Sequence, residues 1–358
     1  MMASQTLSLY LSGYAEATQP GIQALLFDET SGQAHTRWSF AGIANPSFIS
    51  VHPNGRWLFA VSETSAHAEG RAGQVWALEL PAAGSQDQPR ELNHQPSGGD
   101  WPCHLNIDAS GKWLLVTNYQ SGSVSVFPIL ENGALGEMAD QVQHSGHGPN
   151  PERQEGPHTH SSIFTPDQRF VIVADLGLDQ LVIYAFDAQQ GKLREHVRVD
   201  SQPGSGPRHM VFHPNQRLLY VSHELNNTVV VYDYDAQAHS LQARQTLTTI
   251  PQDTAENVVA DIHITPAGDR LLISNRGHNS LALFPLNPDG TLREATFAPC
   301  GGDWPRQFTF SPSGTFVLVA NQKSGEVAVF PLLTDAPGLG EPRTRVPMAQ
   351  ASCVAFAQ

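Results

Sequence analysis

The sequence is poor in cysteine, in positive charge and in long apolar segments. Its three cysteines, Cys103, Cys300 and Cys353, are widely spaced and form no Cys-x-x-Cys pair. Neither a disulfide framework nor a zinc knuckle is expected, and a reducing compartment is the simpler interpretation. No stretch approaches the roughly 18 apolar residues of a membrane helix, so we expect a soluble, cytoplasmic protein that does not bind membranes.

Positive charge is scarce: 20 lysine and arginine residues stand against 34 aspartate and glutamate residues, a formal net charge of −14. Nucleic acids and anionic membranes need a basic surface, so neither is expected as a partner. Helical periodicity of useful length is also missing. The sequence contains no G-x-S-x-G element and no Walker A or dinucleotide glycine motif in a strand-to-helix setting.

What the chain has instead is an internal repeat. Each copy has a proline beside a polar residue, alternating apolar positions, a Pro/Asp/Gly turn and an apolar run that ends in polar residues. The copies lie 44 to 56 residues apart, a period that is typical of propeller blades rather than helical solenoids. Six copies begin at Asn45, Trp101, Gly156, Gly206, Val259 and Trp304.

We therefore expect an all-β fold, a seven-bladed β-propeller of four-stranded antiparallel blades that forms a single domain over residues 1–358. Residues 352–358 resemble the first strand of a blade, and residues 7–16 resemble a later strand. Pairing of these N- and C-terminal strands would complete the seventh blade and remove the free edge there. The polar stretches at residues 82–99 and 146–156 are expected to be loops.

The repeat predicts where polar side chains gather. The first strand of each blade lines the central channel, and antiparallel pairing places its start beside the end of the second strand. A turn centred near residues 167–168 then puts His160 opposite Asp175, and a turn at residues 215–216 puts Arg208 near His223 and Glu224. The same reasoning brings His104 toward Asn118, and His263 toward the strand that ends in Asn275 and Arg276.

These side chains would gather on one face of the axis. Their cationic and titratable groups suit an anionic ligand. The alternative is that these side chains only hydrogen-bond strand ends and hydrate the channel. A purely structural device should repeat uniformly, but the Asn45 copy has Ser47 and Phe48 where the other copies have His or Arg. The segment "HTH" could also hold zinc or copper. Neighbouring arginines would repel a metal ion, so no metal and no cofactor are predicted. The set comprises His104, His158, His160, Arg208, His209, Glu224, His263, Arg276 and Arg306.

Four segments are similar to the seven-bladed propeller lactonase family, which includes the cycloisomerase-type 6-phosphogluconolactonases and the carboxy-cis,cis-muconate cyclases. They contain the motifs "PERQEGPHTH", "GPRHMVF", "VSHEL" and "SNRG", with "WPRQF" near the C-terminus. The similarity extends from about Pro46 to the C-terminus. It departs from the family at Gln307, where relatives commonly have His, and at His223, where Asn is frequent.

The resemblance implies metal-independent hydrolysis of 6-phosphoglucono-δ-lactone in the pentose phosphate pathway. It implies that His160, Arg208, Glu224 and Arg276 are catalytic. Arginine stays protonated and cannot be the general base, which leaves Glu224 or His160 for that role. Arg208 and Arg276 suit the oxyanion and the phosphate. The predicted substrate-binding residues are Arg153, His158, His209, His263, Arg306 and His104.

Three other functions remain open at the level of sequence. One is a muconate-type cyclase or a lactonase for an unphosphorylated acid, the second is a non-catalytic scaffold, and the third is a calcium- or zinc-dependent lactonase. The scaffold would present exposed aromatic residues and few converging arginines. The expected partner is a small anionic lactone, and the expected state is a monomer or a weak homo-oligomer.

Overall fold

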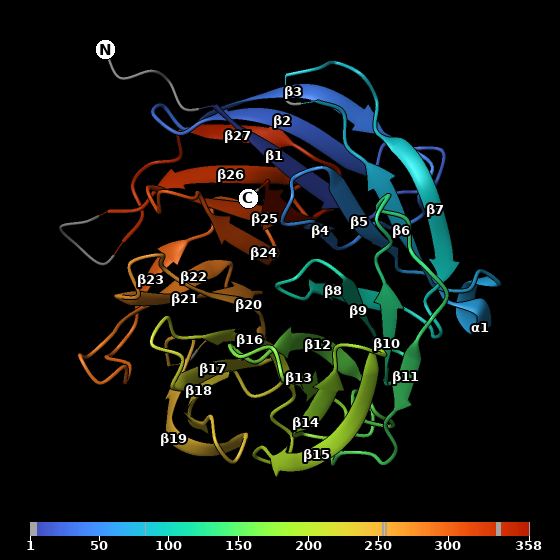
Figure 1. Ribbon diagram of the computed structural model, residues 1–358. Coiled ribbons are helices and arrows are strands. Elements are labelled where there is room, and N and C mark those ends of the chain that lie inside the picture. The colour runs from blue at the N-terminus through green and yellow to red at the C-terminus, as the bar shows by residue number, and fades with distance from the viewer. Residues whose placement is uncertain (1–5, 83, 253, 255, 334–337, 358) are drawn as a thin grey trace.

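Seven four-stranded antiparallel sheets are arranged as blades around a central axis (Figure 1). The computed structural model describes residues 6–82, 84–252, 254, 256–333 and 338–357. Within them the only helix is the single-turn α1 (Ala66–Glu69). No helix in this described part is long and apolar enough to cross a membrane. The predicted all-β, seven-bladed propeller is confirmed.

The strand order within every blade runs outward from the axis, and the first strands of neighbouring blades contact one another. The first three blades are β28 (Ala351–Phe356), β1 (Thr6–Gly13), β2 (Ile22–Asp28), β3 (Gln33–Phe40); β4 (Ile49–Val51), β5 (Trp57–Ser62), β6 (Gln74–Glu79), β7 (Arg90–Pro96); and β8 (Pro102–Ile107), β9 (Trp113–Asn118), β10 (Ser123–Pro128), β11 (Asp140–Gln143). The next two are β12 (Thr159–Phe164), β13 (Phe170–Asp175), β14 (Gln180–Asp187), β15 (Lys192–Asp200); and β16 (Pro207–Phe212), β17 (Leu218–His223), β18 (Thr228–Asp235), β19 (Ser240–Thr248). The last two are β20 (Val258–Ile264), β21 (Arg270–Arg276), β22 (Ser280–Pro285), β23 (Thr296–Pro299); and β24 (Pro305–Phe310), β25 (Phe316–Asn321), β26 (Glu326–Pro331), β27 (Thr344–Pro347).

The position of a strand within its blade explains its composition. The second strand is covered on both faces by neighbouring blades, and all six residues of β13 (FVIVAD) are buried. An outermost strand such as β15 (KLREHVRVD) pairs with another strand along one edge only, and its side chains are largely exposed. This difference corrects one expectation, because the polar residues 82–99 contain the outermost strand β7. Residues 146–156 do form a loop, between β11 and β12.

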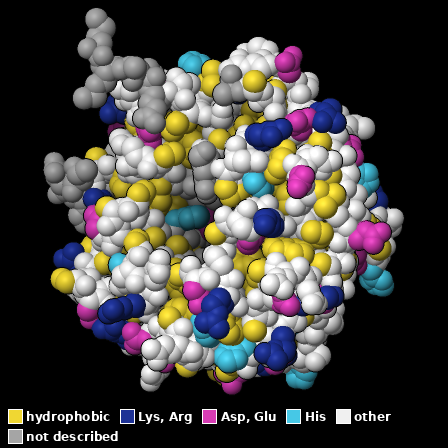
Figure 2. Space-filling view, viewed as in Figure 1, with side chains coloured by type: hydrophobic (Ala, Val, Ile, Leu, Met, Phe, Trp, Pro, Cys, Tyr) yellow, Lys and Arg dark blue, Asp and Glu magenta, His cyan; other side chains and the backbone are white. Residues whose placement is uncertain are grey.

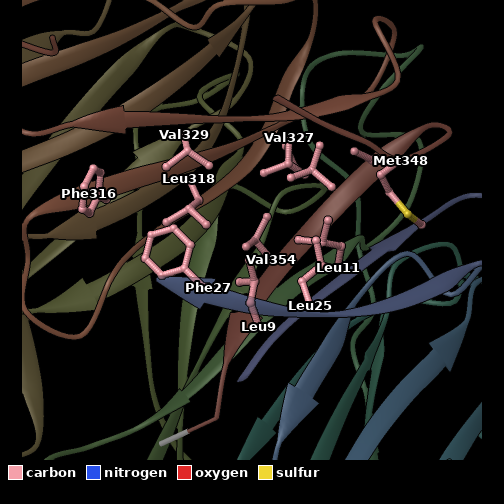
Figure 3. Close-up of a cluster of buried hydrophobic side chains, with 13 residues drawn as sticks. Leu9, Leu11, Leu25, Phe27, Phe316, Leu318, Val327, Val329, Met348 and Val354 are labelled. Carbon is pink, nitrogen blue, oxygen red and sulfur yellow. The ribbon is translucent and has the colours of Figure 1, made fainter. Parts of the chain in front are cut away.

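The ring closes through its two terminal strands, as predicted. β28 is antiparallel to β1, with Leu9 opposite Phe356 and Leu11 opposite Val354. The closing blade packs on the preceding one through a cluster of buried apolar side chains from β1, β2, β25, β26 and β28 (Figure 3). In this cluster the rings of Phe27 and Phe316 meet edge to face, with centroids 5.7 Å apart. Apolar packing, aliphatic and aromatic, therefore joins the N- and C-terminal parts of the chain.

Candidate active site

A β-bulge near the start of the first strand recurs in six of the seven blades. The register shifts in the pairs β8–β9, β12–β13, β16–β17, β20–β21, β24–β25 and β28–β1. A bulge leaves an extra residue out of the ladder and re-aims its side chain. The residues left out of the pairing are Cys103, His160, Arg208, Ala260 with Asp261, Arg306 and Ser352. Five of the six predicted channel residues on first strands lie in or directly beside such a bulge, the exception being His263.

The bulges correct the predicted pairing by one residue. Thr159, not His160, is opposite Asp175. In the next blade Pro207 is opposite His223, so Arg208 lies beside that pair, near His223 as predicted, but out of the ladder. A strict two-residue alternation cannot foresee an inserted residue, and each bulge turns a side chain into the channel that the alternation would have placed elsewhere.

Asp175 has a structural role instead. Its Oδ1 accepts hydrogen bonds from the backbone N–H groups of His158 (2.8 Å) and Leu178 (3.0 Å). Its Oδ2 lies 2.6 Å from Nδ1 of the fully buried His144, whose Nε2 contacts the hydroxyl of Tyr184 at 2.8 Å. This network fixes the loop that carries His158 and the start of β12.

Glu224 joins three arginines at the upper end of the channel, the end at which the first strands begin. Its Oε2 accepts from Arg208 Nε (2.8 Å) and Arg276 Nη2 (2.7 Å), and its Oε1 accepts from Arg153 Nη2 (2.6 Å). The four residues come from the 146–156 loop, β16, the residue after β17 and the end of β21, so they belong to neighbouring blades (Figure 1). The prediction that Glu224 lies near Arg208 is confirmed by this contact.

Burial and charge compete within this cluster. Burial alone would raise the pKa of Glu224, but Arg276, Arg208 and Arg153 hold the pKa of that carboxyl well below its usual range. Burial lowers the pKa of Arg276 to about 10 despite the nearby carboxylate, with Arg208 acting in the same direction. Glu224 is therefore ionised at every physiological pH, and the cluster carries net positive charge.

A second carboxylate, Glu63, lies across the channel mouth and was not singled out from the sequence. Its Oε2 accepts from the hydroxyls of Tyr14 (2.8 Å) and Ser47, and lies 3.9 Å from Arg306 Nη2. Arg306 also lies over the ring of Tyr14, 5.2 Å from its centroid. Burial raises the pKa of Glu63, although Arg306 opposes the shift. The only sequence signal for the group around Glu63 was the polar residue Ser47 in the repeat copy that begins at Asn45.

Tyr119 links the loop arginine to the two histidines of the "HTH" segment. The ring of His158 stacks on Tyr119, with centroids 4.6 Å apart, and the ring of His160 meets it edge-on at 5.5 Å. The Tyr119 hydroxyl accepts from Arg153 Nη2 at 3.5 Å. His158 Nε2 contacts Glu155 at 3.2 Å, so the two imidazoles are held by different partners. The described residues contain no cluster of three or more His, Cys, Asp or Glu side chains arranged to hold a metal ion.

The remaining histidines lie lower in the channel, which corrects the prediction of a single polar face. His263 pairs with Leu272, whereas Asn275 and Arg276 are opposite Val259 and Val258. With His104 and His209, His263 lines a cavity of about 360 Å³ that extends to the residues ending the first strands. The space-filling view along the axis shows histidine within the hollow at its centre (Figure 2). His263 therefore lies away from the Glu224 cluster.

Trp304 is a further site residue, beyond those predicted from the sequence. Its ring lies under the guanidinium of Arg276 (5.7 Å to the centroid) and the ammonium of Lys323 (3.4 Å). Its φ of 68° is in the left-handed region, rare for a bulky residue, and Trp101 has a φ of 52°. Both tryptophans belong to a "GGDWP" segment, and this duplication was the available signal. Unusual backbone of this kind is concentrated at functional sites.

The cysteines do not supply a nucleophile. All three are buried free thiols, and burial raises the pKa of Cys103 to about 12, with Glu63 adding to the shift. Burial likewise raises the pKa of Cys353 to about 12 and that of Cys300 to about 11. A thiol, rather than the nucleophilic thiolate, is present at neutral pH.

Seven four-stranded blades around a channel, with arginines converging on one buried carboxylate, define a β-propeller with an anion-type site at its axis. The chain matches the family model described as "Lactonase, 7-bladed beta-propeller" over residues 8–356, and it belongs to that family. The fold and family predicted from the sequence, and with them the class of enzyme, a lactone hydrolase, are confirmed.

Named relatives resemble the chain over nearly its whole length. The chain is 32% identical to the 6-phosphogluconolactonase of Bacillus subtilis, covering 90% of each sequence. It is 34% identical to the 6-phosphogluconolactonase of Formosa agariphila, covering 87% of this chain and 88% of the relative. Among solved structures, the periplasmic gluconolactonase of Pseudomonas aeruginosa superposes with a TM-score of 0.91 at 27% identity, covering 99% of both chains.

Proposed function

We propose that the chain hydrolyses 6-phosphoglucono-δ-lactone to 6-phosphogluconate at the upper end of the channel, without a metal ion. The observation that carries this proposal is the convergence of Arg153, Arg208 and Arg276 on Glu224 within a propeller lactonase. A phosphorylated lactone needs cationic groups for its phosphate and for the oxyanion that forms during attack on the carbonyl.

Two guanidinium groups in the cluster retain donors for a ligand. Arg208 Nη1 and Arg276 Nε are buried and have no hydrogen-bond partner among the described residues. Leaving a buried donor unsatisfied is costly, and a substrate oxygen would satisfy it. Arg208 is 2% exposed and borders a small cavity at the base of this cluster, which suits the oxyanion. Arg153 and Arg276, with Trp304 and Lys323 beside the latter, suit the phosphate.

Glu224 positions arginines rather than transferring a proton. A carboxylate that accepts from three guanidinium groups is too weak a base to deprotonate water. Burial, reinforced by the charge of Arg208, lowers the pKa of His160 well below its usual range, so that imidazole is neutral. A neutral imidazole donates one N–H, as suits polarisation of the lactone carbonyl. His160, Arg208, Glu224 and Arg276 thus remain the proposed catalytic group.

The other predicted residues divide by position. Arg153, His158 and Arg306 lie at the upper end, where they would contact the substrate. His104, His209 and His263 line the lower cavity, so a role in binding the substrate is proposed for none of the three. We propose a cytoplasmic location, matching a sugar-phosphate substrate, and a single domain that acts as a monomer or weak homo-oligomer.

The test is hydrolysis of freshly prepared 6-phosphoglucono-δ-lactone, followed by proton release with chelator present and spontaneous decay subtracted. Turnover that is lost in Arg208→Ala and His160→Ala supports the proposal. An absence of acceleration over background would overturn it. The similarity to a gluconolactonase favours unphosphorylated glucono-δ-lactone as the second candidate substrate, and the same assay measures it.

A further inference from the structure

His209 belongs to a buried imidazole–carboxylate–imidazole chain in the channel. Its Nδ1 lies 2.7 Å from Asp261 Oδ1, and the other oxygen, Oδ2, lies 2.9 Å from His263 Nε2 and 3.2 Å from the Phe308 backbone N–H. Asp261 is itself 3% exposed, and the nearby histidines, His263 foremost, hold its pKa far below the usual range against the effect of burial. An ionised carboxylate only accepts hydrogen bonds, so Nδ1 of His209 carries the proton. Its Nε2 then has the free lone pair of a base.

His209 stands between the two parts of the channel. It lines the lower cavity of about 360 Å³ and also a small cavity of about 10 Å³ beneath the bulge residues. The small cavity is bordered by His160, Arg208 and Arg306, and the His160 and His209 ring centroids are 5.2 Å apart. A volume of this size holds about one water molecule where polar partners are available. His160 Nδ1 and Arg208 Nη1 are buried polar atoms without a protein partner on residues that border it.

Other candidate bases lack this arrangement. His160 Nδ1 and His104 Nδ1 have no acceptor among the described residues to fix their tautomer. Glu224 is committed to three arginines. A base oriented by a third group is the recurring arrangement of enzymes that activate a hydroxyl or water nucleophile.

We propose that His209, oriented by Asp261, is the general base of the lactonase reaction and activates a water molecule in the small cavity beneath His160 and Arg208. This inference rests on the proposed function and reassigns a proton transfer left open between Glu224 and His160. His209 Nε2 takes a proton from water while the oxygen bonds to the lactone carbonyl carbon. The carbonyl π electrons move to the oxygen, which Arg208 and His160 stabilise. Collapse breaks the ring C–O bond, and the imidazolium returns its proton to the leaving alkoxide, giving the hydroxy acid that ionises in water.

The surroundings of His209 keep it neutral between turnovers. Burial lowers the pKa of His209 to about 4, and Arg208 adds to the shift while Asp261 opposes it. The titratable and charged groups that face it are His104, His160, Arg208, Asp261 and His263, with Arg306 and Cys103 across the small cavity. The unprotonated form therefore predominates at neutral pH, and the transient imidazolium is stabilised by Asp261.

The decisive experiment measures kcat and KM for the lactone in His209→Gln, His209→Ala and wild type. His209→Gln should lower kcat by 10²–10⁴-fold with little change in KM, as expected for loss of a general base. In His209→Ala, added imidazole should enter through the adjoining 360 Å³ cavity and restore part of kcat in a saturable manner. His35→Gln, on the exposed face of β3, is the matched control for the substitution.

Asp261→Asn tests the positioning residue. Asp261→Asn should lower kcat and change the acid limb of the pH profile of kcat. Asp261→Glu keeps the carboxylate, so it should recover part of kcat and the wild-type acid limb. A purely structural role for Asp261 would not restore the acid limb. Retained kcat in His209→Gln, or a loss in His209→Ala that imidazole does not relieve although the variant melts as wild type does, would overturn the proposal. The lactonase function survives that result. Absence of lactone turnover by wild type would instead overturn both.

Discussion

At the scale of single residues, the channel depends on side chains that have no use in a plain strand. Arg208, 2% exposed, is fully surrounded by protein, and its ion pair with the Glu224 carboxylate is the main interaction that offsets its burial. Burial lowers the pKa of Arg208, and the carboxylate opposes that shift. The charge of Arg208 is kept at the upper end of the channel because Glu224 is shared among three cations. Function and stability therefore depend on the same ion pairs.

Replacing Arg208 by lysine retains the charge but removes the planar fork. The Nε that pairs with Glu224 and the free Nη1 cannot both be reproduced by one ammonium group. We expect Arg208→Lys to lose most of its activity, measured as kcat/KM for 6-phosphoglucono-δ-lactone. Near-normal turnover in this variant would rule out a forked role for the guanidinium.

Replacing Glu224 by glutamine leaves three arginines close together without a counter-charge. Removal of one partner from a buried ion pair costs about 3–5 kcal/mol. We expect Glu224→Gln to lower the free energy of unfolding by about that amount and to reduce kcat at least tenfold, by urea titration and by the lactone assay. Glu195→Gln, which breaks the half-exposed pair with Arg198, is the control and should change stability by less than about 1 kcal/mol. Equal stabilities of the two variants would contradict the importance of the cluster.

At the scale of elements, the recurrent bulge and the terminal pairing matter most. The bulge turns side chains of the first strands into the channel, and the pairing of β28 with β1 fixes the blades in a closed ring. Because the closing blade is built from both ends of the chain, its packing controls the whole ring.

Phe27→Ala should weaken this closure. Phe27 is fully buried between the closing blade and the preceding one, against Phe316 (Figure 3). Its ring also meets that of Phe356 edge to face. Truncation of a buried aromatic ring costs about 3–5 kcal/mol. A thermal melt of Phe27→Ala should show that loss, whereas Leu130→Ala, at a side chain that is 46% exposed, should stay within about 0.5 kcal/mol of wild type. Similar melts for both variants would contradict this account of ring closure.

At the scale of the whole molecule, acid should destabilise the fold well before the carboxylates titrate. Burial lowers the pKa values of His209 and His223 to about 4, and it also lowers those of His104 and His160. Unfolded histidines titrate near 6.5, so below that pH the unfolded chain binds protons that the folded chain refuses. Their contribution to stability is complete above pH 6.5 and is lost as the pH falls toward 4.

Each such histidine contributes up to about 1.4 kcal/mol per pH unit within this window. Urea titrations at pH 7, 6 and 5 should therefore show a free energy of unfolding that falls steeply. His263 acts in the opposite direction, because the charge of Asp261 raises its pKa against the effect of burial. Replacing His223 by Asn should make the free energy of unfolding fall less steeply between pH 7 and pH 5. An unchanged slope in that variant would contradict the contribution of His223 to the acid sensitivity.

Much of the architecture could be predicted from the sequence, for a physical reason. A blade needs an apolar second strand, a tight turn and a short first strand, and these local requirements repeat at a period near fifty residues. The turns predicted at residues 167–168 and 215–216 are confirmed by positive φ at Gln168 and Gln216. The exposed strand β7 was missed, because an edge strand with one covered face has a composition close to that of a loop.

The sequence by itself determined the blade count, the closure of the ring by its termini and the types of residue at the site, because each follows from local pattern or from chain ends that need a partner. Only the tertiary structure decided the position of those residues. Bulges shifted His160 and Arg208 out of register, Glu224 became the shared partner of three arginines, and His209 was joined to Asp261 from another blade. Contacts between blades join residues far apart in the sequence, 52 positions for both His209–Asp261 and Arg276–Glu224, and a local pattern contains no information about which of them meet.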